Sequence, residues 1–464
     1  MDGPPGDLHA RMGVARADIT PPVGIRQHLW GVSRHEVADG VHRPLTATAL
    51  AIVAADGSAR VLLSLDVCEW ADPDDERVVR DDVVRRCGLA PADLLLHSTH
   101  THSAAAPCTR QAALVGGEHI APHLRMIAER SAAAATEALA AARPAVLTWG
   151  TGASTLAVNR DQDLHGRQVV GWQPGAPADS TVLVGRVTGQ DGGQIAVLVG
   201  YACHATVLGW GNRLLSPDYV GALREHVESA APGALCLFVQ GASGELAPAR
   251  QYSADPADAD RAGESLALSV EATLALMNPP DRRLQLAGVV ESGAPLGVWD
   301  ARPTAARHDV RSDILTVRLV RRTPAGVPIA DALPEHVRAE RAARAAMVDH
   351  AAGTQTWIDY PVWVWQLGEA VVVAHPGEAY SWLARTLRAA LAPRPVLIAN
   401  LTNGAGAFYL PPASAYARPS YTVGQTPAGP GSLEAVAQAV LDHLGVSPAA
   451  SHLLFTTQEQ GVEL

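Results

Sequence analysis

Short apolar runs alternate with longer amphipathic or alanine-rich segments along almost the whole chain of 464 residues. Runs of about four to eight apolar residues are typical of buried strands, whereas the longer segments, bounded by proline and glycine, are typical of helices. The predicted strands are 46–54, 61–67, 94–96, 181–186, 194–201, 234–239, 362–365, 369–374 and 396–401, after a strand-entry segment at 13–24. The predicted helices are 73–86, 123–142, 218–230, 258–276, 334–351, 378–390 and 432–444. This order predicts an α/β fold with a central, mostly parallel or mixed sheet flanked by helices.

No repeat, low-complexity linker or clear break in composition divides the chain. We therefore expect one large catalytic domain over residues 1–464, in which 1–12 are flexible and 452–464 form a C-terminal tail. Apolar residues make up 48% of the chain, which is ample for a core of this size. No run of about 18 apolar residues occurs, so we expect no integral membrane segment. The net charge of −11 argues against nucleic acid and anionic membranes as partners.

Two features indicate a cytoplasmic protein. The first twenty residues lack the basic region and apolar stretch of a secretory signal peptide. The five cysteines are scattered, without a C-x-x-C pattern, as in proteins of a reducing compartment. We expect a small-molecule partner and leave a homo-oligomer open. The chain contains no lysine, which excludes a Schiff-base lysine, a P-loop lysine and a carbamylated lysine between metals.

Polar segments follow four of the predicted strands. They are HSTHTHS at 97–103, YACHAT at 201–206, HPGE at 375–378 and FYLPP at 408–412. In α/β folds the carboxyl ends of strands are where binding sites form. Two imidazoles and an oxygen donor are a common catalytic zinc set with one position left open. Each segment alone also fits a structural role: a polar loop, a core histidine, a glutamate at a helix N-terminus, or an aromatic lid.

The first segment allows a more specific interpretation. If the chain stays extended after the strand, side chains two residues apart point the same way. His100 and His102 would then share a face and could both reach one ion. His97 has the opposite parity and is interpreted as structural.

The chain resembles the neutral/alkaline non-lysosomal ceramidase family, specifically its shorter bacterial single-domain members without the C-terminal immunoglobulin-like domain. The segments that carry the resemblance are GVARADITPP at 13–22, GVHRPLTATALAI at 40–52, LHSTHTHS at 96–103, NR at 159–160, YACHAT at 201–206, NRLLSPDYVG at 212–221, FVQGASGELAP at 238–248, PGEAYSWLARTLR at 376–388 and the stretch 400–421. They follow the family's order and cover nearly the whole chain.

The resemblance implies one zinc ion per chain and a set of site residues. The implied metal ligands are His100, His204, Glu378 and Tyr409. The implied substrate-side residues are His102, Arg160 and Tyr421. The implied activity is hydrolysis of a carbon–nitrogen amide bond, in an N-acyl amide or a ceramide-like substrate, by metal-activated water. In this interpretation His102 takes the proton of the water and returns it to the leaving amine.

The chain departs from the family at a position associated with activity. Where the family has a serine in G-D-V-S-P-N, this chain has Ala247, which offers no hydroxyl. Ser243 lies nearby, but Glu245 stands where a nucleophile elbow requires glycine. Activity is therefore expected to rest on zinc and water alone.

Several alternatives stay open. The same site could serve an ester or lactone hydrolase, or an acyl-transfer or amide-forming enzyme acting on a specialised metabolite. A non-catalytic ligand-binding homologue that lost turnover is an alternative of another class. An amidohydrolase-type barrel built on the H-x-H is disfavoured by the absence of lysine. Asp66 is interpreted either as a partner that orients a metal-bound histidine or as a buried turn cap. Among the five tryptophans near these segments, Trp30 and Trp210 are the main candidates for the pocket, and most of the set, which also includes Trp363, Trp365 and Trp382, is expected to be core.

Overall fold

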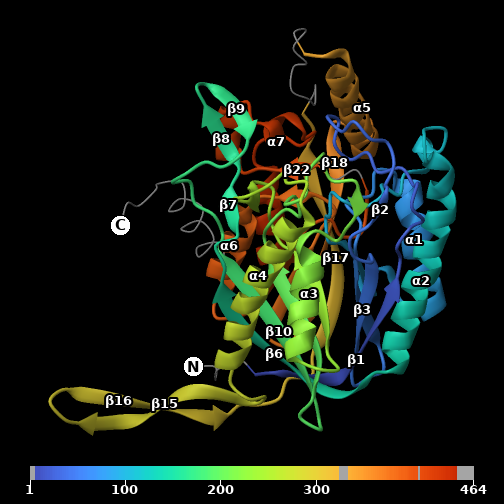
Figure 1. Ribbon diagram of the computed structural model, residues 1–464. Coiled ribbons are helices and arrows are strands. Elements are labelled where there is room, and N and C mark those ends of the chain that lie inside the picture. The colour runs from blue at the N-terminus through green and yellow to red at the C-terminus, as the bar shows by residue number, and fades with distance from the viewer. Residues whose placement is uncertain (1–5, 323–332, 406–407, 447–464) are drawn as a thin grey trace.

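The computed structural model describes residues 6–322, 333–405 and 408–446, and its largest element is an eight-stranded mixed sheet (Figure 1). In spatial order its strands are β13 (Leu235–Gln240), β11 (Gln194–Tyr201), β10 (Thr181–Gly189), β6 (Arg143–Ala153), β1 (Leu8–Asp18), β3 (Thr46–Val53), β4 (Ala59–Leu65) and β5 (Leu94–Ser98). The pairs β11–β13 and β4–β5, one at each edge, are parallel, and the other five pairs are antiparallel.

A second, four-stranded sheet packs against one face of the first. Its strands in spatial order are β17 (Val310–Val320), β18 (Trp357–Leu367), β19 (Ala370–Ala374) and β21 (Val396–Ala399), and the pair β19–β21 is parallel. The core between the sheets contains Leu50 and Leu198 from the first sheet and Trp365 and Leu397 from the second. Strands buried on both faces read as nearly continuous apolar runs, which explains the TATALAIV sequence of β3.

Helices cover the outer faces and complete four layers. On the large sheet, α1 (Pro73–Cys87) and α2 (Ile120–Ala140) cover β3 to β5, and α3 (Tyr219–Ala230) and α4 (Pro256–Leu276) cover β10, β11 and β13. On the small sheet, α6 (Ser381–Leu391) and α8 (Ser432–His443) form the outer layer. The predicted α/β class with a mixed sheet flanked by helices is confirmed. The arrangement differs in one respect: each sheet carries helices on one face only, because the other face is buried against the second sheet.

The two edges of the large sheet come together at one side of the molecule. The Ser64 hydroxyl in β4 donates to the carbonyl of Phe238 in β13 at 2.7 Å, and the Gln240 amide donates to Nε2 of His97 at 2.9 Å. The Asn400 amide, after β21, donates to the Gln240 carbonyl at 3.0 Å. The carboxyl ends of the three parallel pairs therefore meet in one place, and four polar loops converge there.

The remaining elements are short or peripheral. The short strands are β2 (Gly40–Val41), β7 (Ala157–Asn159), β8 (Asp161–Leu164), β9 (Arg167–Val170), β12 (Leu214–Leu215), β14 (Leu246–Pro248), β20 (Glu378–Ala379) and β22 (Tyr409–Leu410). The helix α5 (Glu335–Ala352) stands above the loops that follow the strands, near the short α7 (Tyr421–Gly424) (Figure 1). Within the described residues, no helix is long and apolar enough to cross a membrane.

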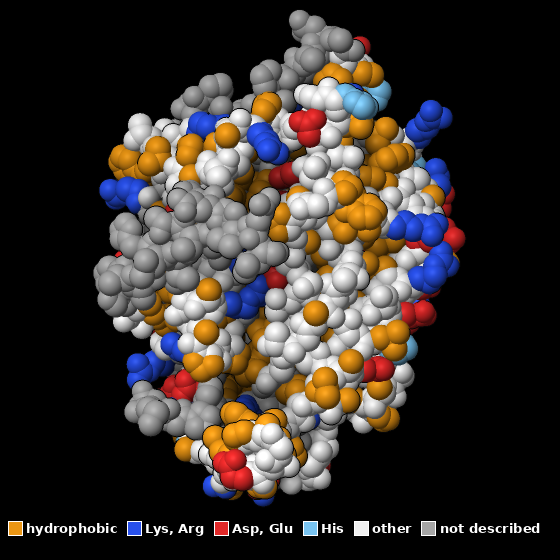
Figure 2. Space-filling model, turned by 90° about the vertical axis from the view of Figure 1, so that its left-hand side faces the viewer, with side chains coloured by type: hydrophobic (Ala, Val, Ile, Leu, Met, Phe, Trp, Pro, Cys, Tyr) orange, Lys and Arg blue, Asp and Glu red, His pale blue; other side chains and the backbone are white. Residues whose placement is uncertain are grey.

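A long hairpin of β15 (Arg282–Glu291) and β16 (Pro295–Pro303) projects from the body of the molecule (Figure 1). It was not predicted. Figure 2 views this hairpin end-on at the bottom and shows hydrophobic side chains gathered on it. Leu284, Val289 and Trp299 are each more than half exposed.

Two sequence predictions need correction. The segment 1–12 was expected to be flexible, but Leu8 and Met12 are fully buried in β1, which pairs with β6. Residues 1–5 and the predicted tail 452–464 lie outside the described residues. The helix predicted to begin at Glu378 begins at Ser381. Glu378 instead lies in β20, whose parallel partner β22 contains Tyr409, so the carboxylate is not at a helix N-terminus.

Candidate metal centre

The HSTHTHS segment leaves the end of β5 through an unusual backbone conformation. His100 has φ of +66°, a left-handed conformation that non-glycine residues seldom adopt and that occurs mainly where surrounding structure enforces it. Its amide donates to the Val67 carbonyl at 3.0 Å, and Thr101 forms a bridge with Ala205 in the loop after β11. The chain is therefore not extended here, and the period-of-two argument for His100 and His102 is wrong. Both side chains nevertheless point into the same site.

Two histidines and one glutamate converge at this point, all of them fully buried. Nε2 of His204 lies 2.9 Å from Oε2 of Glu378, and Nε2 of His100 lies 3.5 Å from the same oxygen. The ring centroids of the two histidines are 4.7 Å apart. The three ligand atoms lie within 4.8 Å of one another, close enough to bind a single ion. The structure thus brings together His100, His204 and Glu378, three of the four predicted metal ligands.

Backbone carbonyls fix the tautomers of both histidines. Nδ1 of His100 donates to the Cys68 carbonyl at 2.8 Å, and Nδ1 of His204 donates to the Leu246 carbonyl at 2.9 Å. Because a carbonyl oxygen only accepts, both Nδ1 atoms carry a proton, so Nε2 is the atom of each ring that presents a lone pair when the ring is neutral. This is the arrangement that holds metal-binding histidines in place. Oε1 of Glu378 is buried and has no hydrogen-bond partner among the described residues.

The electrostatics favour a neutral His204 and a charged Glu378, whereas His100 favours its protonated form when no metal is bound. Burial acts to lower the pKa of His100, but Cys68 and Glu378 hold that pKa well above its usual value. Burial lowers the pKa of His204 to about 3, and Arg160 adds to this effect, so the ring is neutral at pH 7. Burial acts to raise the pKa of Glu378, but His100 and His204 hold that pKa well below its usual range. A neutral imidazole and a carboxylate facing each other are both acceptors, so their approach calls for a cation.

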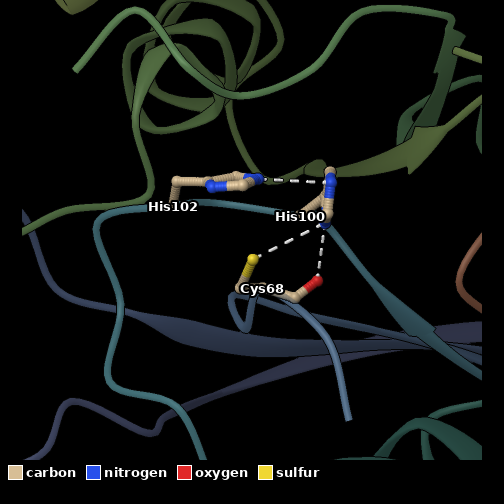
Figure 3. A group of neighbouring side chains, drawn as sticks. All are labelled: Cys68, His100 and His102. Carbon is tan, nitrogen blue, oxygen red and sulfur yellow. Dashed lines mark hydrogen bonds between the residues drawn. The ribbon is translucent and has the colours of Figure 1, made fainter. Parts of the chain in front are cut away.

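A second group, of Cys68, His100 and His102, is also close enough for an ion. Figure 3 shows that Cys68 and His102 contact different ends of the His100 ring. The Sγ atom of Cys68 lies 3.7 Å from Nδ1 of His100, whereas Nε2 of His102 lies 3.3 Å from Nε2 of His100. Since Nδ1 already donates to a carbonyl, one ion cannot use all three groups. Burial also raises the pKa of the Cys68 thiol, which keeps it protonated.

Tyr409 and Arg160 lie beside the three ligands. Arg160 donates from Nη2 to the Tyr409 hydroxyl at 3.1 Å and to the Gly244 carbonyl at 2.8 Å. In the β20–β22 pair Tyr409 is the register partner of Glu378, which places the two residues side by side on adjacent strands. The Tyr421 ring lies 5.7 Å from the Tyr409 ring. The predicted positions of Tyr409, Arg160 and Tyr421 therefore surround one site.

The site opens into a cavity of about 290 Å³. Its polar end is formed by His100, His102, Arg160, Glu378, Tyr409 and Tyr421. Its walls include Leu29, Trp30, Val32, Val170, Tyr252 and Val337. The Trp30 ring lies 5.0 Å from the His102 ring, tilted by 40°, and belongs to an aromatic group with Trp210 and Tyr252. Trp30 thus lines the cavity, whereas Trp210 does not; Trp210 contacts Trp30 and Tyr252 and is 41% exposed.

Other sequence interpretations are decided by their contacts. Asp66 is fully buried in a bidentate ion pair with Arg224 at 2.9 and 2.7 Å and accepts from the Thr99 hydroxyl at 3.1 Å. It orients no metal-binding histidine directly. His97 is structural, as predicted: its Nδ1 contacts Thr402 at 2.9 Å and its Nε2 accepts from Gln240.

Several site residues had no sequence signal. The Cys68 and Leu246 carbonyls that orient the histidines are backbone groups, which a residue pattern does not reveal. Arg341 and Arg344 of α5, with Thr206 and Gln425, also line the cavity. The arginine- and alanine-rich pattern of α5 predicted a helix but did not indicate which face meets a cavity.

The fold and the site define the class of protein: a four-layer α/β domain with a two-histidine, one-glutamate centre at the carboxyl ends of its parallel strands. At the level of sequence, no protein-family model and no curated protein matches the chain. Solved structures, in contrast, do match the fold of this chain. A ceramidase complexed with C2 superimposes with a TM-score of 0.65 at 18% identity, covering 95% of this chain and 76% of the other. The neutral ceramidase from Pseudomonas aeruginosa gives 0.63 at 18% identity, covering 98% and 76%. The chain is thus a structural relative of the neutral ceramidases and shares their fold, which confirms the resemblance.

Proposed function

We propose that the protein is a zinc-dependent hydrolase that cleaves the carbon–nitrogen bond of an N-acyl amide, with one zinc ion per chain. One observation carries the proposal. His100 Nε2, His204 Nε2 and Glu378 Oε2 point at a common buried position that faces a cavity. The shared fold with ceramidases supports the choice of an amide bond.

The residues present fit a zinc ion. Two neutral imidazole nitrogens and a carboxylate oxygen are a usual catalytic donor set, and Tyr409 is the proposed fourth ligand. Zinc supplies Lewis acidity, which polarises a carbonyl group and acidifies water. The unpartnered Oε1 of Glu378 leaves that carboxylate able to accept a further hydrogen bond at the cavity.

Three side chains are proposed to act on the substrate. Burial, with neighbouring His100, lowers the pKa of His102 well below its ordinary value, so its ring is neutral and can accept the proton of a water. Contact with the tilted ring of Trp30 helps to hold this ring in place. Arg160, a permanent cation, and Tyr421 are proposed to bind the carbonyl oxygen or the polar end of the substrate.

The serine-to-alanine difference agrees with this scheme. Ala247 lies in β14, fully buried, and does not line the cavity. Ser243 is also buried; its hydroxyl accepts from Nε2 of Gln240 at 2.6 Å and does not face the cavity. Neither position presents a nucleophile to a substrate, so the attacking group is proposed to be water. The five cysteines are free thiols, and we retain the cytoplasm as the proposed location.

The test combines metal analysis with an assay of matched substrates. Purified protein is expected to contain about one zinc per chain and to hydrolyse an N-octanoyl amide. A chelator is expected to stop the reaction and zinc to restore it. The variant His204→Ala should lose activity, whereas His226→Ala, at a half-buried histidine of α3 that does not line the cavity, should keep it.

Other results of these assays would favour a different function. Faster turnover of the matched octanoyl ester would favour an esterase, and net amide formation from acid and amine would favour the synthetic direction. A folded protein that binds zinc but turns over neither substrate would favour the non-catalytic homologue. A folded protein without bound metal would overturn the proposal.

A further inference from the structure

The helix α5 brings additional positive charge to the cavity, from outside the segments that carry the family resemblance. Arg341 and Arg344, one turn apart on this helix, both line the cavity that contains Glu378 and Tyr421. The loop that carries Trp30 packs on the same helix, since a side chain at Gly31 would meet Glu340. The two guanidinium groups therefore form part of the wall of the cavity that contains the candidate metal centre.

Arg344 is only partly neutralised where it lies. Its nearest carboxylate is that of Glu69, with Nη1 and Oε1 3.6 Å apart, a separation longer than a hydrogen bond. Its Nε is buried and has no hydrogen-bond partner among the described residues. A buried guanidinium nitrogen without an acceptor is costly, and a ligand that supplies an acceptor would remove that cost.

The charges around the cavity favour an anion. Three arginines line it, Arg160, Arg341 and Arg344, against the two glutamates Glu340 and Glu378. A divalent cation at the centre would add to this excess. Arg341 has no ion-pair or hydrogen-bond partner within the described part of the chain. A neutral amide would leave Arg341 without a counter-ion and Arg344 only partly neutralised by Glu69.

The rest of the cavity wall favours an alkyl group. Leu29, Val32, Val170 and Val337 line it together with the ring of Trp30. A ligand that matches both parts has an apolar chain, an amide near the centre and a negative group near α5. Arginine binds a carboxylate through two parallel hydrogen bonds, which gives both affinity and orientation.

We propose that the substrate is an amide bearing a carboxylate, of the N-acyl amino acid type, and that Arg344 with Arg341 binds this carboxylate. The inference rests on the proposed amide hydrolysis. One water is consumed: its oxygen forms a bond to the carbonyl carbon, the carbon–nitrogen bond breaks, and the nitrogen leaves with a proton as the amine of the amino acid. The other product is the fatty acid, so no further reactant is required.

The test compares three substrates on the zinc-loaded protein: N-octanoylglycine, N-octanoylethanolamine as the neutral match, and N-octylsuccinamate, which carries its carboxylate on the acyl side. We expect N-octanoylglycine to have a kcat/KM at least tenfold above its neutral match. In Arg344→Gln this ratio should fall about 10- to 100-fold, as for loss of a charged hydrogen bond. Arg344→Lys keeps the charge and should keep part of the preference for N-octanoylglycine over N-octanoylethanolamine. The control Arg130→Gln, at an exposed arginine of α2, should keep the full preference.

A binding measurement separates recognition from turnover. N-octanoylglycine should bind the chelator-treated protein more tightly than N-octanoylethanolamine does in calorimetry, and Arg344→Gln should remove the difference. If no amide is hydrolysed, the proposed function fails. If amides are hydrolysed but the neutral amide is preferred, or the ratio is the same in Arg344→Gln, the inference about the carboxylate fails alone. A preference for N-octylsuccinamate would overturn the amino acid assignment.

Discussion

Nε2 of His204 lies 2.9 Å from Oε2 of Glu378, and both side chains are fully buried. The Leu246 carbonyl holds the proton of His204 on Nδ1, so the facing atoms are both hydrogen-bond acceptors. Two such acceptors repel unless a proton or a metal ion lies between them. Burial lowers the pKa of His204 to about 3, which disfavours the proton at neutral pH. The pair is therefore best explained as one side of a metal site.

Removal of either member of this pair is expected to abolish tight metal binding. His204→Ala and Glu378→Gln each remove one of three buried donors, and the loss of affinity should exceed the 10- to 100-fold typical of outer-shell changes. Metal content after dialysis and calorimetric titration with zinc would measure the effect. The wild type should also gain thermal stability on zinc addition, by about 3 kcal/mol at a hundredfold excess over Kd, and the variants should not. Retention of one zinc per chain in either variant would contradict this assignment.

His100 and His102 are expected to respond differently to substitution. His100 has its Nδ1 fixed by a carbonyl, like His204, whereas Nδ1 of His102 has no partner among the described residues. His100→Ala should therefore lose zinc. His102→Ala should keep zinc within about tenfold of wild-type affinity while kcat falls 10²- to 10⁴-fold, the usual range for loss of a general base. Equal loss of zinc in both variants would show that both histidines are ligands.

The sequence predicted more of the site than of the way it is assembled. His100, His204 and Glu378 were assigned from the family resemblance, and their convergence agrees with the general rule that strand carboxyl ends build sites. The reason for the convergence was not visible. The large sheet curls until β13 meets β4 and β5, through contacts such as Ser64 with the Phe238 carbonyl, and no local pattern encodes such a long-range pairing.

Individual elements show the same limit. β3, β4 and α1 were placed within two residues of their ends, because turn and capping signals at Gly57 and Gly88 are local. Glu378 was placed in a helix because proline and glycine before a charged segment resemble a helix start. In the structure its backbone pairs with β22, more than thirty residues later, and this tertiary pairing delays the helix. The second sheet was missed since apolar strands do not reveal which layer covers them.

Asp66 and Arg224 form a buried ion pair whose rupture should be costly. Asp66→Asn leaves the Arg224 guanidinium buried without a counter-charge, for which about 3–5 kcal/mol of unfolding free energy is the usual loss. Because Asp66 also accepts from Thr99, next to His100, zinc affinity should fall as well. Urea unfolding of the metal-free protein would measure the first effect and zinc titration the second.

The matched control for this pair is exposed. Asp74 and Arg77 form an ion pair at the surface of α1, so Asp74→Asn should change stability by less than about 1 kcal/mol. The double variant Asp66→Asn/Arg224→Met, which removes both charges, should recover part of the loss. A single variant as stable as the wild type would show that Arg224 finds another partner or solvent.

Glu245 is expected to make stability depend on pH. This fully buried carboxyl accepts from the Ser381 amide at 3.0 and 3.1 Å, and burial raises its pKa to about 7. A carboxyl whose pKa is higher in the folded than in the unfolded state binds more protons when folded. Its contribution therefore stabilises the fold at pH below about 4.5 and is lost as pH rises toward 7. The loss amounts to about 3 kcal/mol at about 1.4 kcal/mol for each pKa unit.

The variant Glu245→Gln isolates this contribution, since glutamine does not titrate. The unfolding free energy of the variant relative to the wild type should rise by about 3 kcal/mol between pH 4.5 and pH 7.5. Urea unfolding of the metal-free proteins at several pH values would measure it, and the exposed Glu264→Gln on α4 should show no such trend. A difference that is constant across this range would contradict the prediction and mean that the hydrogen bonds from Ser381, at the N-terminus of α6, outweigh burial and keep Glu245 ionised throughout.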